Sequence, residues 1–254
     1  MQGAEIVAHR GASFDAPENT ISSVKLAWEQ GTNAVEVDIY LSTDGKVFAI
    51  HDKTPKRYGG PDKPVSKMSW AELQKLDIGA WKDEKYRGEK IPLLSELLPL
   101  IPENGRMFIE IKTGPEIIPE LKRVLQKANR PCKQTAIICF SDKVIAGVRK
   151  ELPHLDAYWL SYLKKNQKPE ERKAPTVEQI IEMAKRLDTT AVDIGGDITE
   201  SDVKKLNEAG LGCYVWTVND PEEARELIKW GVIGITTDKP ALMLEKGIGR
   251  VRKE

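Results

Sequence analysis

The sequence is poor in cysteine, has no excess charge of either sign and contains no long apolar run. Its three cysteines, Cys132, Cys139 and Cys213, are odd in number and far apart, which excludes a disulfide framework. No CxxC pair is present, so a structural zinc site is not expected. Basic and acidic residues both number 39, so the basic excess typical of nucleic-acid-binding proteins is missing. No apolar stretch approaches about 18 residues, and no transmembrane segment is expected.

The composition is that of a soluble globular protein. Of the 254 residues, 40% are hydrophobic, which is enough to bury a sizeable core. The first residues, MQGAEIVAHRG, leave no room for a secretion signal before the first strand. A cytoplasmic location is therefore expected for the chain as written, and a periplasmic or secreted one if a signal peptide has been removed.

Short apolar runs alternate with amphipathic segments along the whole chain. Strands are expected at 6–8, 34–41, 47–50, 107–112, 135–140, 157–162, 191–194, 212–218 and 234–236. Helices are expected at 19–30, 117–128, 177–186, 201–209 and 221–230. About eight strands alternating with helices over this length indicate an α/β protein with a (β/α)8 TIM barrel fold. The alternative is an open doubly wound sheet, but neither GxGxxG nor GxxxxGK[ST] follows an early strand.

One stretch interrupts this rhythm. Residues 53–88 are polar and rich in lysine, glycine and proline, with a single short helical run at 70–76. So long a segment without strands is unusual inside a compact domain. We therefore expect residues 1–254 to form one barrel domain in which 53–88 is a small insertion.

The alternating strand at 34–41 carries two acidic residues on one face. Its valines, isoleucine and leucine share the other face, which must pack on the helices, so Glu36 and Asp38 point into the barrel. The strand at 107–112 repeats the pattern, with Glu110 and Lys112 pointing inward. Three inward carboxylates without clustered Cys or His are typical of a hard cation such as Mg²⁺ or Ca²⁺. The alternative is a buried ion-pair network with Lys112 and Arg10 as counter-charges.

Two of the three histidines follow strands directly. His9 comes after the run at 6–8 and His51 after the run at 47–50, and barrel enzymes carry their catalytic groups at the carboxyl ends of strands. A histidine pair there can act as general acid and base near neutral pH. His154, in a loop beside Pro153, is interpreted as a packing residue.

The residues around these histidines favour an anionic substrate. Arg10 can bind a phosphoryl group as a fork, and Gly11 lets the backbone approach a ligand closely. Trp216 lies near a strand end and either forms a wall of the pocket or packs in the core. Asp193 points inward by alternation and could join the rim of the pocket, although packing or capping is the expected role.

An ordered set of motifs resembles the glycerophosphodiester phosphodiesterase family over nearly the whole chain. In order they are His9-Arg10-Gly11, Pro17-Glu18-Asn19-Thr20, Glu36-Val37-Asp38, Thr43-Asp44-Gly45, His51-Asp52, Glu110-Ile111-Lys112, Phe140-Ser141, Val215-Trp216-Thr217-Val218-Asn219 and Thr237-Asp238-Lys239-Pro240. The chain departs from the family after His51-Asp52, where it has Pro55 and Tyr58-Gly59 in place of a leucine and a threonine pair.

The resemblance implies a TIM barrel that hydrolyses glycerophosphodiesters to glycerol 3-phosphate and an alcohol. It implies that Glu36, Asp38 and Glu110 hold one divalent cation, Mg²⁺ or Ca²⁺. By the same resemblance, His9 and His51 are the acid–base pair. Arg10 and Lys112 stabilise the phosphoryl charge, and Trp216 packs against glycerol. Attack by water and attack by the glycerol 2-hydroxyl, which gives a cyclic phosphate, both fit.

Two other functions compete with this one. A lysophospholipase D-like enzyme would use the insertion to hold an acyl chain, but few Phe, Leu or Ile residues occur in 53–88. A barrel that only binds phosphodiesters would be expected to lack a metal ligand or a histidine, and none is missing. The expected partner is a small glycerophosphodiester substrate, with no nucleic acid, and the sequence leaves the oligomeric state open.

Overall fold

The computed structural model describes residues 3–164 and 174–249, and its strands form a closed barrel. Within these residues the barrel order is β1-β9-β8-β7-β6-β5-β4-β2, all parallel, and β2 closes the ring on β1. The barrel strands are β1 (Glu5–Ala8), β2 (Ala34–Leu41), β4 (Arg106–Ile111), β5 (Thr135–Cys139), β6 (Asp156–Leu163), β7 (Ala191–Gly196), β8 (Gly212–Trp216) and β9 (Gly234–Thr237). The expected (β/α)8 barrel is confirmed.

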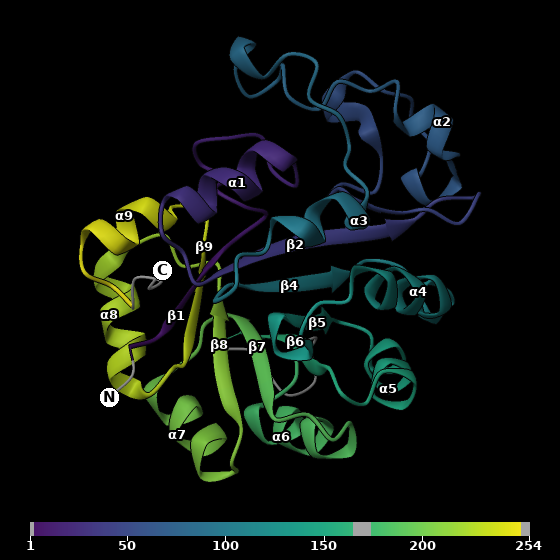
Figure 1. The fold of residues 1–254 in the computed structure, drawn as a ribbon. Helices are drawn as coiled ribbons and strands as arrows, with labels where there is room; N and C mark the ends of the chain where they lie inside the picture. Colours follow the sequence, from purple (N-terminus) through teal and green to yellow (C-terminus); the bar gives the residue numbers. More distant parts are fainter. Residues whose placement is uncertain (1–2, 165–173, 250–254) are drawn as a thin grey trace.

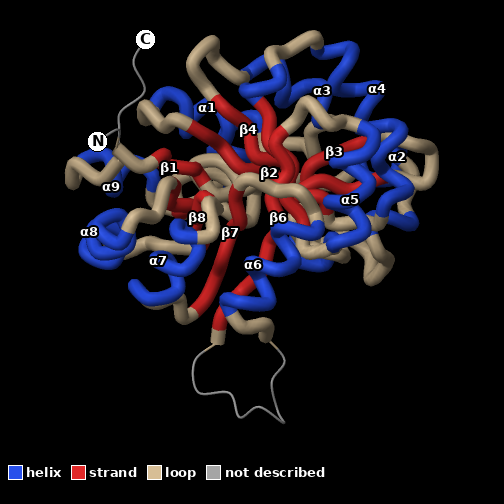
Figure 2. Tube along the Cα trace, turned by 90° about the horizontal axis from the view of Figure 1, so that it is seen from below, coloured by secondary structure: helices blue, strands red, loops and turns tan. Residues whose placement is uncertain are grey.

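Helices surround the strands on the outside (Figures 1 and 2). They are α1 (Ile21–Glu29), α3 (Leu94–Leu97), α4 (Ile118–Ala128), α5 (Asp142–Glu151), α6 (Val177–Arg186), α7 (Glu200–Glu208), α8 (Pro221–Trp230) and α9 (Pro240–Glu245). The main core lies between the two layers, where Val35, Val37 and Ile39 of β2 are fully buried. Fully burying one such side chain contributes roughly 1.5–3 kcal/mol. This packing confirms that the apolar face of β2 points to the helices.

Several helices begin where the sequence supplies a cap. The Thr20 side chain accepts a hydrogen bond from the Ser23 backbone at the start of α1, and Thr199 does the same with Asp202 in α7. Asp220 caps α8, whose first residue is Pro221. A cap of this kind stabilises a helix by about 1 kcal/mol. The expected helices at 177–186 and 221–230 have the expected bounds, whereas α3, α5 and α9 were not anticipated.

The expected strand at 47–50 is present as β3 (Val47–Ala49), but it is not a barrel strand. It runs antiparallel to β2, with Ala49 opposite Ile39 and Val47 opposite Leu41. The sequence suggested that His51 follows a parallel barrel strand, but it follows the antiparallel strand β3 instead. His51 still lies at the carboxyl ends of the barrel strands, because β2 continues past its pairing with β4 and β3 runs back along β2.

The segment after His51 packs around a small core of its own. It contains α2 (Trp70–Leu73) and the 3₁₀ turns η1 (Pro55–Tyr58), η2 (Val65–Lys67) and η3 (Glu84–Tyr86). Its buried side chains join those of β2 and β3 in a separate cluster made up of Tyr40, Phe48, Ile50, Val65, Met68, Leu73, Ile78 and Ile91. Figure 1 shows this segment projecting beyond the end of β2.

The segment also contacts the loop that leads from β1 to α1. Lys82 Nζ donates to the Ser13 carbonyl over 2.8 Å, and Tyr86 Oη donates to the Asp15 carbonyl over 3.1 Å. These contacts hold the segment beside the carboxyl end of β1.

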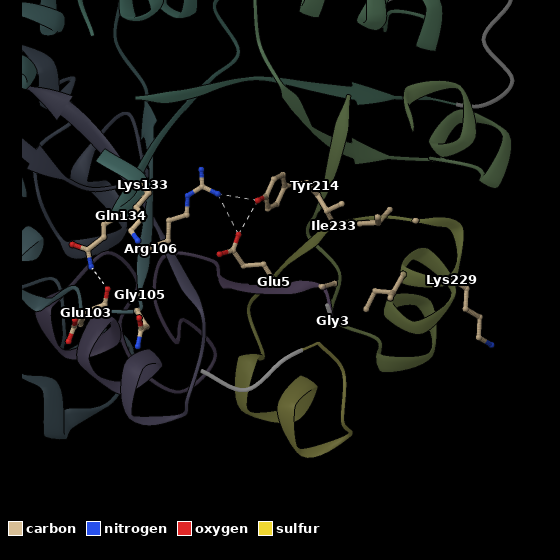
Figure 3. Close-up of a pocket in the computed structure, with 15 residues that line it drawn as sticks. Gly3, Glu5, Glu103, Gly105, Arg106, Lys133, Gln134, Tyr214, Lys229 and Ile233 are labelled. Carbon is tan, nitrogen blue, oxygen red and sulfur yellow. Dashed lines mark hydrogen bonds and ion pairs between the residues drawn. The ribbon is translucent and has the colours of Figure 1, made fainter. Parts of the chain in front are cut away.

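The amino ends of the strands are closed by a network of paired charges. Arg106, the first residue of β4, donates to the Tyr214 hydroxyl (Figure 3). It also donates to Asp156 at 2.5 Å and to the Tyr158 hydroxyl. Tyr214 in turn donates to Glu5 over 3.0 Å. A wide depression of about 1020 Å³ lies beside this network.

Among the described residues, no helix combines the length and apolar character needed to cross a membrane.

Candidate active site

A cavity of about 250 Å³ opens at the carboxyl ends of the strands. The sequence predicted eight catalytic, substrate-binding and metal-binding residues. Seven of them line this cavity, namely His9, Arg10, Glu36, His51, Glu110, Lys112 and Trp216. The eighth, Asp38, lies beneath them and is only 1% exposed. The structure therefore brings the whole predicted set together.

Three carboxylates form a compact acidic group in this cavity. Oxygen atoms of Glu36, Asp38 and Glu110 all lie within 4.8 Å of one another, as a shared cation requires. Burial, with the charges of Asp38 and Glu110, raises the pKa of Glu36 well above its usual range. Burial and the charge of Asp38 raise the pKa of Glu110 to about 7. A bound cation would relieve the repulsion between these carboxylates.

Two basic side chains neutralise part of this charge. Lys112 Nζ lies 2.8 Å from Glu110 Oε1 and 3.2 Å from Asp38 Oδ1, and Arg10 Nε lies 3.3 Å from Asp38 Oδ2. Burial acts to raise the pKa of Asp38, but Lys112 and Arg10 outweigh it, so the pKa is lowered. Both counter-charges expected of a plain ion-pair network are thus present.

The ion pairs do not satisfy the whole cluster. Glu36 Oε2 accepts a hydrogen bond from the Arg10 backbone over 2.9 Å, but the buried Glu36 Oε1 has no hydrogen-bond partner among the described residues. A buried carboxylate oxygen without a partner is costly. The donor set and this free oxygen fit a hard divalent cation.

The turn after β1 holds Arg10 in place through an unusual backbone. Arg10 and Asn19 both have positive φ, 56° and 58°, a conformation that costs about 1–3 kcal/mol when the residue is not glycine. Asn19 compensates by donating to Asp38 Oδ2 and accepting from the Asp38 backbone, both over 2.9 Å. At Gly11, with φ 80°, a Cβ atom would lie 2.6 Å from the Ser23 backbone, so glycine is required there. The first two motifs of the sequence therefore fix the position of Asp38.

His9 is held by a carboxylate from the far end of the chain. Its Nδ1 lies 2.7 Å from Asp238 Oδ1, and Asp238 Oδ2 accepts from Asn219 over 2.7 Å. Burial acts to raise the pKa of Asp238, but the hydrogen bonds from His9 and Asn219 lower it to about 2. Because the ionised Asp238 accepts from Nδ1, Nε2 is the ring nitrogen of His9 that is available to exchange a proton.

His51 has a similar partner that is tied to the inserted segment. Its Nδ1 lies 3.1 Å from Asp52 Oδ1, while Arg57 Nε lies 3.0 Å from Asp52 Oδ2. Arg57 also donates to Glu18 Oε1 over 2.6 Å, and Glu18 accepts from Arg10 over 3.1 Å. Burial lowers the pKa of His51, and the nearby charges of Arg10 and Lys112 add to this.

Glu18, His51 and Asp52 also form a group with the spacing of metal ligands. The Arg57 guanidinium already bonds both carboxylates of this group and stacks on Tyr58 and Trp81, with ring centroids 5.0 and 4.7 Å away. Arg57 supplies the positive charge that these carboxylates need. The group of Glu36, Asp38 and Glu110, which keeps an unpaired oxygen, therefore fits a cation better than this one.

Trp216 forms one wall of the cavity. Its indole lies against Gly195 of β7, where a Cβ atom would come within 2.8 Å of the ring, and it meets Phe140 edge to face at 5.8 Å. Asp193, two residues before Gly195, also lines the cavity and is 2% exposed. Both possibilities that the sequence left open for Trp216 apply, because it packs and also lines the pocket. Asp193 lines the pocket as well, and it forms no cap.

Sequence reasoning gave no role to several residues that hold the site together. They are Glu18, Asn19, Arg57, Asn219 and Asp238. All but Arg57 stand inside the motifs that carry the family resemblance, which was the only signal for them. No strand or helix period links them to their partners, since His9 and Asp238 are 229 positions apart.

Known proteins similar to this chain share its length and fold. The model of the glycerophosphoryl diester phosphodiesterase family matches residues 9–242. The glycerophosphodiester phosphodiesterase of Caldanaerobacter subterraneus subsp. tengcongensis is 32% identical over 244 residues, which cover 94% of this chain and 96% of that protein. The glycerophosphodiester phosphodiesterase of Bacillus subtilis is 29% identical over 257 residues, covering 93% and 84%.

A solved structure points the same way. An Oleispira antarctica phosphodiesterase, in complex with the product sn-glycerol-3-phosphate, superposes with a TM-score of 0.85 at 27% identity over 96% of both chains. The likeness extends over the barrel and the inserted segment together. The expected enzyme class is thus confirmed, and the chain belongs to the glycerophosphoryl diester phosphodiesterase family.

Proposed function

We propose that this enzyme hydrolyses small glycerophosphodiesters to glycerol 3-phosphate and an alcohol in a reaction that depends on one divalent cation. The observation that supports this most strongly is the arrangement of the cavity. Three carboxylates with a free oxygen lie beside two histidines, each held by its own carboxylate. Membership of the family supports the substrate class.

Glu36, Asp38 and Glu110 would hold the cation, and Mg²⁺ and Ca²⁺ are the candidates for an all-carboxylate set. When bound, the cation supplies positive charge to a phosphoryl oxygen. Arg10 and Lys112 would bind the remaining phosphoryl oxygens, because both line the cavity with their positions fixed by Glu18, Asp38 and Glu110.

The two histidines would divide the proton transfers. We assign the base to His51, because its lowered pKa keeps it neutral in mildly acidic solution. Nε2 of His51 would take the proton from the attacking hydroxyl, which belongs either to water or to glycerol C2. His9 would donate a proton to the oxygen of the departing alcohol, oriented by Asp238. The acidic limb of kcat/KM should then lie below about pH 6.5, the ordinary histidine value.

The alcohols we propose are small head groups such as choline or ethanolamine. Residues 53–88 would act as an insertion within a single barrel domain and hold His51 through Asp52 and Arg57. The buried side chains of this segment pack on β2 and β3, which leaves them unavailable for an acyl chain.

Release of glycerol 3-phosphate tests the proposal. Glycerophosphoethanolamine and glycerophosphocholine would be incubated with EDTA, Mg²⁺, Ca²⁺ or Mn²⁺ in parallel. We expect release that requires a metal and is lost in His9→Ala. His154→Ala is the matched control, because this exposed histidine lies outside the cavity and its loss should leave activity unchanged.

Two outcomes would contradict the proposal. If no metal supports release from either substrate, the barrel binds phosphodiesters without hydrolysing them. If lysophospholipid in mixed micelles is turned over preferentially, the substrate class is wrong and the lysophospholipase D-like activity replaces it.

A further inference from the structure

The lining of the cavity is divided into two unlike halves. The charged half consists of His9, Arg10, Glu36, His51, Glu110 and Lys112. The opposite half is formed by β5 to β8 and is apolar, with Ile138, Phe140, Leu160 and Trp216. A substrate with a phosphoryl group at one end and a neutral organic group at the other matches this division.

Asp193 lies within the apolar half and has no obvious structural purpose there. Its neighbours in strand register are Leu160 and Tyr214, and its side chain is 2% exposed. Its Oδ1 has no hydrogen-bond partner among residues 3–164 and 174–249. Leaving a buried carboxyl oxygen unpaired is costly, and native structures rarely do so without a ligand or a water to satisfy it.

A second unpaired group lies on the adjacent strand. Trp216 Nε1 is buried and lacks an acceptor among the described residues, and its indole lies over Gly195, two positions along β7 from Asp193. The apolar half thus offers one free donor and one free acceptor. A hydroxyl group satisfies both, because it accepts one hydrogen bond and donates another.

Other ligands fit this pair less well. Asp193 is not part of the acidic group whose oxygens lie within 4.8 Å of one another, so it is not a ligand of the same cation. A quaternary ammonium would have no acceptor for the Trp216 N–H and no donor for the carboxyl.

We propose that Asp193 and Trp216 bind a hydroxyl of the glycerol moiety, with a carboxyl oxygen of Asp193 accepting a hydrogen bond from the hydroxyl and Trp216 Nε1 donating one to the hydroxyl oxygen. Asp193 is then the residue that selects glycerol over alkyl groups that carry no free hydroxyl. This inference rests on the proposed function, since it assumes that the phosphodiester carries glycerol.

The experiment compares two substrates that differ only in the hydroxyls, glycerophosphocholine and propyl phosphocholine. In Asp193→Ala we expect kcat/KM for glycerophosphocholine to fall by about tenfold to a hundredfold. The value for propyl phosphocholine should change by less than about threefold. Asp193→Asn, which still offers an acceptor, should keep most of the preference, and thermal denaturation checks that each variant is folded.

Binding of sn-glycerol 3-phosphate and propyl phosphate, measured by calorimetry, tests the same preference without turnover. The inference is overturned if Asp193→Ala weakens the reaction and the binding of both compounds equally. It is also overturned if the loss follows the choline group instead of the hydroxyls. If the wild type hydrolyses no glycerophosphodiester but still prefers glycerol 3-phosphate, the proposed function fails while the binding role of Asp193 stands.

Discussion

The two ends of the barrel both contain buried charges, but among the described residues buried carboxyl oxygens without a hydrogen bond occur at only one end. At the amino ends, Arg106 bonds Asp156 and two tyrosine hydroxyls, and Glu5 accepts from Tyr214. At the carboxyl ends, Arg10 and Lys112 pair with Asp38 and Glu110, but Glu36 Oε1 and Asp193 Oδ1 have no hydrogen-bond partner in the described parts of the chain.

This difference separates a structural cluster from a functional one. A network whose carboxylates are all paired stabilises the fold, whereas a cluster with unpaired carboxyl oxygens has a free energy that falls when a cation or a hydroxyl binds. Substitutions at the amino ends should therefore change stability, and substitutions at the carboxyl ends should change activity.

The largest expected effect is on activity at the carboxyl ends. Glu36→Gln removes one ligand charge, so kcat/KM at limiting metal should fall by about a hundredfold to a thousandfold, with the thermal unfolding temperature unchanged or higher. A titration of activity against metal concentration measures this. Glu5→Gln is the matched control at the other end, where we expect lower stability and full activity. Normal activity of Glu36→Gln at limiting metal would remove this residue from the site.

Arg106→Met should give the converse result at the amino ends. It leaves Asp156 and the two tyrosine hydroxyls without their donor and removes the ion pair with Glu5, and breaking such a buried pair costs about 3 kcal/mol of unfolding free energy. Urea denaturation measures the loss, and kcat/KM per folded molecule should equal that of the wild type. A large fall in kcat/KM without a loss of stability would show that the two ends are not separate in function.

Asp193→Asn should stabilise the protein at neutral and alkaline pH. In the unfolded chain this carboxyl ionises near pH 4, but burial and the charge of Glu110 raise its folded pKa to about 8. Between these values the folded state binds more protons, so its stability falls as pH rises. The variant should gain about 1–3 kcal/mol at pH 8 and little at pH 4, by urea denaturation. Equal effects at both pH values would contradict this account.

The smallest expected effect concerns Arg57, which resembles Arg106 in bonding two carboxylates and stacking on two rings. Arg57 is partly exposed, so Arg57→Met should cost no more than about 1 kcal/mol of stability. Losing its charge beside Asp52 should raise the pKa of His51. The acidic limb of kcat/KM should then move to higher pH, with about a tenfold loss of activity at pH 6.

Arg57→Lys keeps the charge and should restore part of this activity. A pH–rate profile that does not move in either variant would show that Arg57 has no influence on His51.

The fold and the acidic group could be predicted because they follow from the spacing of apolar and polar residues within single strands and helices. Alternation along β2 and β4 placed Glu36, Asp38, Glu110 and Lys112 inside the barrel, since residues two apart share a face. Helix α5 was missed because Gly147 interrupts its apolar face, and α9 because it has only six residues.

The direction of β3 and the partners of the histidines could not be derived in this way. The antiparallel return of β3 depends on its pairing with β2, and no local pattern distinguishes it from another barrel strand. Asp238 reaches His9 only because β9 lies beside β1 in the closed barrel. Contacts of this kind follow from the fold as a whole.

The hairpin of β2 and β3 has an evolutionary consequence. Main-chain hydrogen bonds hold the inserted segment at both ends, from Ile50 to Asp38 over 3.0 Å and from Ala49 to Pro92 over 2.9 Å. The segment between these anchors can therefore change in length or sequence while these two main-chain bonds still hold the strand that leads to His51. Such a change would have to retain Arg57, because Arg57 is the residue of the segment that bonds Asp52 beside His51.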